Sequence, residues 1–543
     1  MKKAKWIYQY TKGTRVFLFL LALAAIVSAF CNVLIAYVLK LFIDVATGEQ
    51  NTSLADVVIL TGSVLIIGGA VSILASVLRN KLECDIEAKL RTEIMRAVFG
   101  ADYYEVSGLH TGEVLTRMTE DTAAAAQFFP CVINDVIGSL AVALIAVVYL
   151  FLLNTKLTLI MFVTIPILIA VISLFNFPIA KADKLRKEAE EQNRICMQEQ
   201  LANIKGIKTY HAGKRCLEIL RQLYGKFSRR KIRFGMWEGL AFFLNGLISN
   251  AMLLIALGVG AYFIIAGQTT VGVLVAVVQL LNYIIQPFGQ ISQAISKLAQ
   301  AGSSVDRICE ILDTRRDIQE GEKNVQNIFA LNMKNICFSY GEKRILKGFS
   351  YCFSKNCMYC IVGENGSGKS TLLHIIAGLY HPQSGEITLT DDHGAEQKVT
   401  IQNYISFVSA EEKLFSASVK DNITFFEADA DIEKVMDAIE QVRMMEFVQS
   451  LPQKLDSDVA EEGRSLSSGQ IQRIAISRIL YQNNEIIIMD EPTTNLDAES
   501  VEIFLSIIAE LKKNHIVIIA SHDEQLIQVS DFVVNITEVM ECE

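Results

Sequence analysis

Residues 351–370 contain two spacings of side chains that could carry chemistry. Cys352, Cys357 and Cys360 follow the pattern C-x4-C-x2-C, which can hold an iron–sulfur cluster. Directly after them, residues 363–370 read G-x-x-x-x-G-K-S, the loop that surrounds phosphate groups in nucleotide hydrolases. A four-ligand cluster needs another cysteine, and the next is Cys542, near the end of the sequence. We therefore expect no cluster and interpret the three cysteines as small side chains of a strand–turn–strand segment.

The phosphate loop lies between a strand-like apolar run, MYCIV, and a segment with helical periodicity, STLLHIIAGL. A strand, a glycine-rich loop and a helix N-terminus place backbone N–H groups around phosphate oxygens. We predict that Lys369 reaches the β- and γ-phosphates of ATP and that the Ser370 hydroxyl ligates Mg²⁺. The residues predicted to contact the nucleotide here are Gly363, Glu364, Asn365, Gly366, Ser367, Gly368, Lys369, Ser370 and Thr371.

Two later apolar runs end in side chains suited to hydrolysis. Residues 486–491, IIIMDE, predict a buried strand whose end presents Asp490 as a second Mg²⁺ ligand. Glu491 follows it and is suited to act as the general base that polarises the attacking water. Residues 517–522, VIIASH, predict another strand that delivers His522 toward the γ-phosphate. The predicted catalytic residues are therefore Glu491, His522 and Lys369.

These residues occupy only the second half of a long chain. Its 543 residues favour two or more domains, and 51% of them are hydrophobic. Long charge-free runs explain this composition, since about 20 apolar residues span a bilayer. A single run could be a buried core helix, and the first could be a signal peptide, but that run is longer than a signal segment. Six membrane helices are predicted at about 16–43, 54–79, 128–154, 157–180, 239–265 and 271–296.

The distribution of Lys and Arg predicts the orientation of these helices. The first fifteen residues carry five, residues 79–135 carry six and residues 181–238 carry fifteen, whereas the other connections carry one or none. Basic connections favour the cytoplasmic side, so both termini are expected there. The long basic connections read as helical continuations below the membrane. A net charge of −9 argues against nucleic acid as a partner.

After about residue 313 the sequence changes to short β-rich runs separated by helical segments. This pattern predicts a mixed α/β domain with a largely parallel sheet. We expect a membrane domain over residues 1–310, a linker over 311–330 and a nucleotide-binding domain over 331–543.

At residues 466–473, LSSGQIQR, the sequence resembles the signature segment of ATP-binding cassette (ABC) proteins. Nearly the whole chain is similar to an ABC exporter half-transporter, in which an all-α membrane domain of six helices precedes an α/β P-loop ATPase domain. HTGEVLTRMTED (110–121) matches the first cytoplasmic coupling region of that family and HAGKRCLE (211–218) the second. VDRICEIL (305–312) matches the start of the linker.

The resemblance implies a homodimer or heterodimer in which two cassettes enclose two ATP molecules with Mg²⁺. The residues implied to meet the partner's nucleotide are Ser467, Ser468, Gly469, Gln470 and Asp497. Tyr340 matches the aromatic residue that stacks on adenine. Two positions depart from the family pattern: Ser468 replaces a glycine, and Ala410 replaces a glutamine that ligates Mg²⁺. Alanine has no oxygen to offer, so we hypothesise that Glu411 or Glu412 substitutes, or that the partner supplies the better site.

We expect ATP-driven export of a bulky neutral or amphipathic cargo (a peptide, lipid or hydrophobic drug) across the cytoplasmic membrane. Import of a metal–siderophore through the same fold, or an ATP-gated channel or regulatory membrane protein, are the alternatives. The candidate cargo-lining side chains are neutral amides, which equally well join helices by hydrogen bonds. They are Asn245, Asn250, Gln279, Asn282 and Gln286.

Overall fold

The computed structural model describes residues 2–109, 111–314, 327–364, 366–410, 412–459, 466–494 and 496–537. Within these ranges it does not describe the side chains of residues 2, 157, 160–176, 245, 248, 249, 286, 288 and 292. The chain divides into two compact units. The helical unit comprises Met1–Met95 and Gly112–Leu312, and the sheet unit comprises Arg96–Thr111 and Asp313–Glu543.

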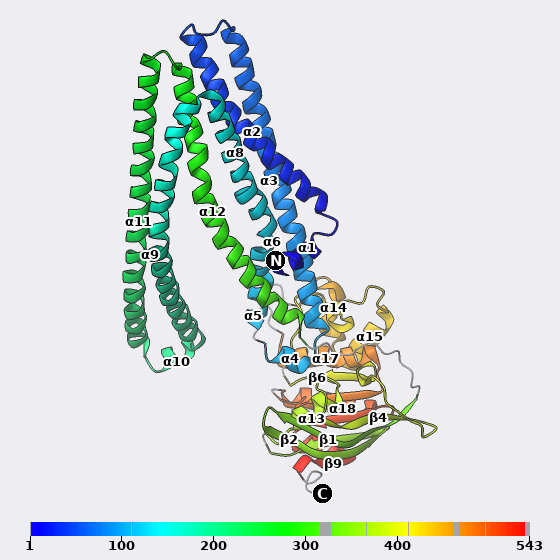
Figure 1. Cartoon of the computed structure of the whole chain (residues 1–543). Coiled ribbons are helices and arrows are strands. Elements are labelled where there is room, and N and C mark those ends of the chain that lie inside the picture. The colour runs from blue at the N-terminus through cyan, green and yellow to red at the C-terminus, as the bar shows by residue number, and fades with distance from the viewer. Residues whose placement is uncertain are drawn as a thin grey trace. The chain divides into compact units, whose positions relative to one another are not determined.

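The helical unit is built from long helices joined by short turns (Figure 1). Its long helices are α2 (Arg15–Ala46), α3 (Leu54–Phe99), α8 (Ser139–Leu153), α9 (Thr155–Ala202), α11 (Gly213–Ile265) and α12 (Val271–Leu312). Its shorter elements are α1 (Lys2–Tyr10), α5 (Thr111–Thr116), η1 (Arg117–Asp121), α6 (Thr122–Ala126), α7 (Phe128–Pro130), η2 (Cys131–Gly138) and α10 (Ile204–Thr209). Helices α9 and α11 run side by side as a long hairpin with α10 at its tip.

Four helical stretches among the described residues are long and apolar enough to cross a membrane: Arg15–Ala46, Leu54–Phe99, Thr111–Leu153 and Val271–Leu312. They contain the predicted spans 16–43, 54–79, 128–154 and 271–296. The predicted spans 157–180 and 239–265 lie in α9 and α11, and Asn250–Ile265 is a shorter apolar stretch. The number six therefore stays a prediction. The charge-free runs do form helices, which satisfy their own backbone groups as a bilayer requires.

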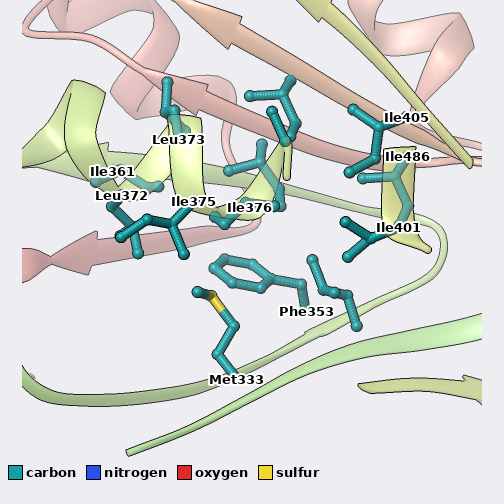
Figure 2. Packing of buried hydrophobic residues seen from close by; sticks show 14 of the residues in the cluster. Met333, Phe353, Ile361, Leu372, Leu373, Ile375, Ile376, Ile401, Ile405 and Ile486 are labelled. Carbon is teal, nitrogen blue, oxygen red and sulfur yellow. The ribbon is translucent and has the colours of Figure 1, made fainter. Parts of the chain in front are cut away.

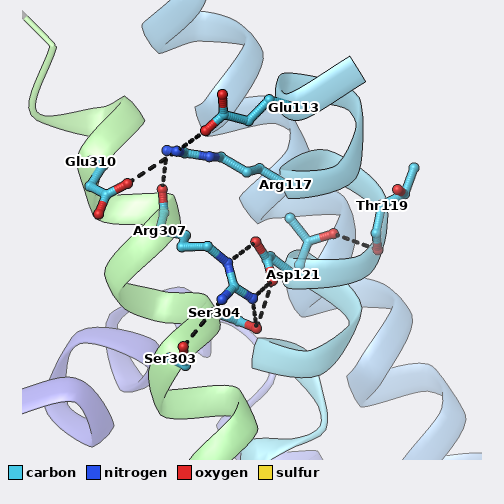
Figure 3. A network of polar contacts seen from close by, with 9 residues as sticks. Glu113, Arg117, Thr119, Asp121, Ser303, Ser304, Arg307 and Glu310 are labelled. Carbon is cyan, nitrogen blue, oxygen red and sulfur yellow. Dashed lines mark hydrogen bonds and ion pairs between the residues drawn. The ribbon is translucent and has the colours of Figure 1, made fainter. Parts of the chain in front are cut away.

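A network of charged side chains joins η1 to the last turns of α12 (Figure 3). The Arg307 guanidinium donates to the nearly buried carboxylate of Asp121, which also accepts a 2.8 Å hydrogen bond from the Ser304 hydroxyl. Arg117 donates to the Arg307 carbonyl at 2.8 Å and pairs with Glu310 at 3.1 Å. These contacts fix the end of α12, directly before the predicted linker, against the segment that begins at residue 112.

The sheet unit contains two sheets, and its strands carry the predicted nucleotide residues. One is antiparallel with the order β2-β1-β4-β5, and the other is parallel with the order β6-β7-β8-β3-β9. The strands are β1 (Ile328–Tyr340), β2 (Lys343–Ser354), β3 (Cys357–Val362), β4 (Ser384–Asp391), β5 (Glu396–Gln397), β6 (Ile405–Val408), β7 (Ile486–Asp490), β8 (Ile516–Ala520) and β9 (Phe532–Asn535). Strands β7 and β8 read IIIMD and IVIIA and are buried throughout, as central strands of a parallel sheet require.

Helices cover the parallel sheet and fill the space between the two sheets. They are α13 (Lys369–Ile376), η3 (Ile401–Tyr404), α14 (Val419–Thr424), α15 (Ile432–Gln441), α16 (Met445–Ser450), η4 (Lys454–Asp456), α17 (Ser468–Gln482), α18 (Ala498–Leu511) and α19 (Glu524–Val529). Figure 2 shows Leu372, Ile375 and Ile376 of α13 packed with Phe353 of β2 and Met333 of β1. This core holds the phosphate loop, at the start of α13, rigidly against β3.

The three cysteines of the opening segment lie on strands, as predicted. Cys352 belongs to β2, and Cys357 and Cys360 belong to β3, which enters the phosphate loop. Cys360 is fully buried, and burial raises the pKa of its thiol to about 11. Such a thiol stays protonated and acts as a small apolar side chain.

Residues 96–111, which comprise the last turn of α3 and the segment after it, belong to the sheet unit. Their short helix α4 (Tyr103–Ser107) is capped by Asp102, whose carboxylate accepts a hydrogen bond from the Tyr104 N–H at 2.9 Å. The predicted first coupling region, 110–121, spans the boundary between the two units and stays a prediction. Its residues from Gly112 onward belong to the helical unit, whereas the segment that packs on the sheets precedes it. The double tyrosine in this segment supplies the contacts described below.

Candidate nucleotide-binding site

The phosphate loop connects β3 to α13, as the sequence predicts. Gly368 has a φ of +103°, and a Cβ there would lie 2.6 Å from a methyl group of Ile345, so only glycine fits. The Lys369 ammonium folds back and donates to the Gly363 carbonyl at 2.7 Å. Among the described residues the buried Ser367 hydroxyl has no hydrogen-bond partner. A buried polar atom of this kind fits a loop that receives phosphate oxygens, which accept hydrogen bonds.

The two predicted Mg²⁺ ligands lie together at the end of β7 and the start of α13. The Ser370 hydroxyl hydrogen-bonds the carboxyl of Asp490, which is 9% exposed. Burial raises the pKa of Asp490, the charge of Glu491 adds to this rise, and Ser370 and Lys369 oppose it. A buried carboxylate with a hydroxyl beside it is an oxygen donor set that suits Mg²⁺. The residues present therefore fit the metal.

Glu491 and His522 meet because β7 and β8 are neighbouring parallel strands, paired at Asp490 and Ala520. The Glu491 Oε1 lies 3.0 Å from the His522 Nδ1, and its backbone N–H donates to the Ala520 carbonyl at 2.8 Å. Glu491 has a φ of +46°, an uncommon conformation for a residue with a side chain. Because the backbone turns here, the two consecutive carboxylates point to different partners. Asp490 contacts Ser370, and Glu491 contacts His522.

Tyr340, at the end of β1, lies in an aromatic cluster with partners from distant parts of the sequence. Its hydroxyl is 3.2 Å from that of Thr371, the residue after Ser370, and its ring is 5.2 Å from that of Phe338. With 38% of its surface exposed, the ring keeps area free for an adenine to stack on. Its place beside the phosphate loop agrees with the implied role, which stays a prediction.

Tyr103 and Tyr104 of α4 complete this aromatic cluster. The Tyr104 ring centroid is 6.0 Å from that of Phe338, 5.9 Å from that of Tyr340 and 5.5 Å from that of Tyr380. Tyr103 stacks on Tyr380 at 6.1 Å. Sequence analysis missed both tyrosines. The only available signal was the exposed aromatic pair in DYYE between two helical segments, and nothing local indicates its partners.

The signature residues occupy a different helix N-terminus, that of α17. Ser467 caps the helix by accepting from the Gln470 N–H at 3.2 Å, and the Gln470 side chain accepts from the Ser467 N–H at 3.0 Å. Ser468 is the first helical residue. A Cβ on Gly469 would lie 2.8 Å from the Ser500 hydroxyl. The N-terminus of α17 is thus suited to bind an anion. The side chain of Gln470, predicted to contact the partner's nucleotide, is hydrogen-bonded within the helix cap.

Asp497 caps α18, the next helix N-terminus in the sequence. Its carboxylate accepts a 2.9 Å hydrogen bond from the Ser500 N–H. Hydrogen bonding by the Ser500 hydroxyl, and next by this N–H, lowers the pKa of Asp497. The prediction that Asp497 lies at a seam between two cassettes is not tested by a single chain. The remaining predicted contacts, Gly363, Glu364, Gly366 and Thr371, are in the loop and first turn as predicted, and Asn365 lies outside the described residues.

Ala410 follows β6, and one of the two carboxylates considered as substitutes for the missing glutamine is already paired. Glu412 accepts from the Ser409 N–H at 2.8 Å and from the Arg478 guanidinium at 2.9 Å. Both partners of the Glu412–Arg478 ion pair are nearly buried. Arg478 also donates to the Asn422 carbonyl at 2.7 Å. Glu412 is therefore committed to the signature helix, which does not favour it as a metal ligand, and Glu411 lies outside the described residues.

Comparison with known proteins identifies the family. A model described as the ABC transporter transmembrane region matches residues 18–288, and a model described as ABC transporter matches residues 346–494. The chain belongs to the ABC transporter family. These matches cover both units, and they identify the sheet unit as an ATP-binding domain whose hydrolysis of ATP is coupled to transport. They also make the chain a multi-pass membrane protein.

The relatives of this ABC transporter include proteins named for export. It is 28% identical over 463 residues to a putative multidrug export ATP-binding/permease protein of Staphylococcus aureus, covering 84% of this chain and 79% of the relative. It is 28% identical over 445 residues to ABC transporter B family member 1 of Dictyostelium discoideum, covering 80% of this chain but only 48%, about half, of that relative. A bacterial Atm1-family ABC exporter with ATP bound has the same fold, with a TM-score of 0.75 at 20% identity, over 97% of this chain and 94% of the other.

Proposed function

We propose that this ABC transporter is an ATP-driven exporter that moves a bulky neutral or amphipathic cargo, such as a peptide, lipid or hydrophobic drug, out of the cytoplasm. The observation that carries the proposal is the contact of Glu491 with His522, next to the Ser370–Asp490 pair, in a chain that also contains long apolar helices. A chain that only bound ATP would not need a positioned base. The naming of the Staphylococcus aureus relative for multidrug export supports the direction and does not favour the importer or channel alternatives.

The geometry supports a division of roles in hydrolysis. Lys369, at the start of α13, supplies a positive charge to the β- and γ-phosphates once ATP displaces its ammonium from the Gly363 carbonyl. Ser370 and Asp490 would hold Mg²⁺, which neutralises charge on the phosphates when it is bound. Glu491 accepts a proton from the attacking water, and His522, 3.0 Å away, holds the Glu491 carboxylate in place.

We further propose that the complete site forms in a dimer, homomeric or heteromeric. Ser467 and Gly469 lie at the N-terminus of α17, whereas Lys369 begins α13, so the chain presents two separate helix N-termini suited to phosphate. A second copy or a related half-transporter would bring its signature helix to the lysine loop of the first. The absence of a side-chain oxygen at Ala410 makes a heteromeric partner with the glutamine a natural possibility.

Transport in this proposal follows from a shift between two states. Closure of two cassettes on ATP would favour one arrangement of the membrane helices, and hydrolysis would restore the other. The basic connections, including residues 181–238, support a cytoplasmic location of both termini in this proposal. The α4 segment is suited to transmit closure because its tyrosines contact Tyr340 beside the nucleotide loop.

The proposed cargo class rests on the side chains that face it. Asn250 and Asn282 are exposed in the described structure, while Gln279 donates to the Tyr283 hydroxyl at 3.3 Å within α12. Asn245 and Gln286 have side chains outside the described residues. These neutral amides suit hydrogen bonds to a cargo without a strong charge. The Gln279 contact lies within one helix, so the alternative role of joining two helices stays open.

Transport into inside-out membrane vesicles tests the proposal. The chain is expressed in its native membrane orientation, and uptake of fluorescent hydrophobic amphiphiles is measured with and without Mg-ATP. Export predicts ATP-dependent accumulation inside the vesicles, lost in Glu491→Gln and retained in the control Glu510→Gln, whose residue is exposed in the last turn of α18. Loss of preloaded probe on addition of ATP would indicate import, and flux down a gradient in Glu491→Gln would indicate a channel.

A further inference from the structure

A pocket of about 710 Å³ opens between α9 and α11, the two helices of the long hairpin (Figure 1). Its walls are apolar and aromatic, with Phe177 from α9 and Met236, Trp237 and Leu240 from α11. Two cationic side chains, Lys181 and Arg233, line the same pocket. It therefore combines a large apolar surface with two positive charges, which is the composition of a site for an anionic amphiphile.

The charge balance of the pocket depends on whether its two cations are paired with acidic side chains. Among the described residues, neither Lys181 nor Arg233 forms an ion pair. By contrast, Arg186, one turn further along α9, donates to Asp183 at 2.7 Å and to Glu190 at 2.8 Å. Arg230 on α11 donates to the Leu185 carbonyl at 2.9 Å. Arg186 is thus neutralised within the hairpin, whereas the two cations that line the pocket are available to a negative charge from outside the chain.

The pocket lies at the level where both helices leave the apolar region. Lys181 is the first charged residue after the apolar run that ends at Ala180, and Trp237 lies two residues before the charge-free run that starts at Gly239. Tryptophan and long basic side chains occupy this depth in membrane proteins, with apolar parts toward the hydrocarbon and polar ends toward the headgroups. The connection between these runs, 181–238, is the most basic of the chain, which places the pocket at the cytoplasmic leaflet.

From this combination we infer that the α9–α11 pocket binds an anionic phospholipid of the cytoplasmic leaflet. Lys181 and Arg233 contact the phosphate and headgroup, and the acyl chains lie against Phe177, Trp237 and Leu240. A zwitterionic lipid carries its own positive charge and gains less from two uncompensated cations. Basic pockets between membrane helices on this side are suited to anionic headgroups. The inference requires only that the hairpin lies in a bilayer, and it does not rest on ATP hydrolysis or export.

Trp237 provides a direct reporter, since the chain has only two tryptophans and the other is Trp6. In a full-length Trp6→Phe protein, Trp237 is the single tryptophan. The protein is reconstituted in phosphatidylcholine vesicles to which a small fraction of one brominated lipid is added. This lipid is either phosphatidylglycerol or phosphatidylcholine, in each case with bromine on the acyl chains. Bromine quenches tryptophan fluorescence only at contact, so the dependence on the brominated fraction reports the relative affinity for each lipid.

Each basic side chain near an anionic headgroup contributes about a fivefold gain in affinity, so the pair predicts a preference of about 25-fold for phosphatidylglycerol. Lys181→Gln with Arg233→Gln should reduce this preference to below about twofold. Lys205→Gln with Lys208→Gln, in α10 at the tip of the hairpin, is the matched control and should retain it. ATP hydrolysis, measured in parallel, verifies that each variant is folded.

Three results would overturn the inference. Equal quenching by the two brominated lipids would show that the pocket takes bulk lipid without regard to charge. No quenching by either lipid would show that a second copy of the chain or another protein covers the pocket. A preference that persists in Lys181→Gln with Arg233→Gln, but disappears in the α10 control, would place the anionic lipid elsewhere on the hairpin.

Discussion

Tyr104 provides a test of how the segment after α3 is held on the sheet unit. Its ring contacts those of Phe338, Tyr340 and Tyr380 at centroid distances between 5.5 and 6.0 Å. Each aromatic pair contributes about 0.5–1.5 kcal/mol beyond the area that it buries. Because 40% of Tyr104 is exposed, we take the low end for its three ring pairs, about 1.5 kcal/mol together. The partial burial of the ring adds to this, so we expect Tyr104→Ala to weaken the docking of α4 by at least about 2 kcal/mol.

A loss of this size corresponds to about a 30-fold increase in the population of the undocked segment. Hydrogen–deuterium exchange of the full-length protein measures it directly, because amides that exchange through local opening speed up in proportion to that population. We therefore expect backbone amides within residues 103–107 to exchange about 30-fold faster in Tyr104→Ala. Tyr104→Phe is the matched control, since it keeps the ring and should change the rate by less than about twofold. Unchanged exchange in Tyr104→Ala, or an equal rise in Tyr104→Phe, would refute the reasoning.

Three further predictions concern the nucleotide site. Burial raises the pKa of Asp490, so on a rise in pH this carboxyl ionises in the unfolded protein before it ionises in the folded one. Ionised Asp490 therefore lowers the stability of the nucleotide-free protein at neutral pH, and this loss disappears as the pH falls. Asp490→Asn should raise the thermal midpoint without nucleotide and remove the further rise that Mg-ATP gives. Glu412→Ala leaves the Arg478 guanidinium buried without its carboxylate and should cost about 3–5 kcal/mol of unfolding free energy, whereas replacing both by Leu and Met should cost much less. Ala410→Gln should strengthen Mg²⁺-dependent ATP hydrolysis by about tenfold, the effect of one added oxygen ligand or orienting group; an unchanged rate and Mg²⁺ dependence would make the departure incidental.

The part of the site that could be predicted from the sequence consists of side chains that directly follow an easily recognised strand or glycine-rich loop. The strands β7 and β8 are continuous apolar runs, and parallel strands end at the same edge of a sheet, so Asp490, Glu491 and His522 had to come near the phosphate loop. The glycines and Lys369 could be placed in the same way, because a short loop between a strand and a helix can adopt few backbone conformations. These residues were found from their order along the chain.

The contacts that could not be predicted join residues far apart in the sequence. Glu412 and Arg478 are 66 positions apart, and neither lies in a pattern that indicates an ion pair. Tyr104 reaches Tyr340 and Tyr380 from another segment of the chain, in a five-residue helix too short to show periodicity. Tertiary packing decides such contacts.

The central claim is that Glu491 is the base for ATP hydrolysis at a site assembled from the phosphate loop, Asp490 and His522. Phosphate release by the full-length protein in lipid nanodiscs, with saturating Mg-ATP, tests it most directly when Glu491→Gln is compared with wild type. A general base contributes about 10²- to 10⁴-fold, so Glu491→Gln should lower the rate by at least about a hundredfold while binding of Mg-ATP persists. A Glu491→Gln protein that releases phosphate within a few fold of the wild-type rate would contradict the account.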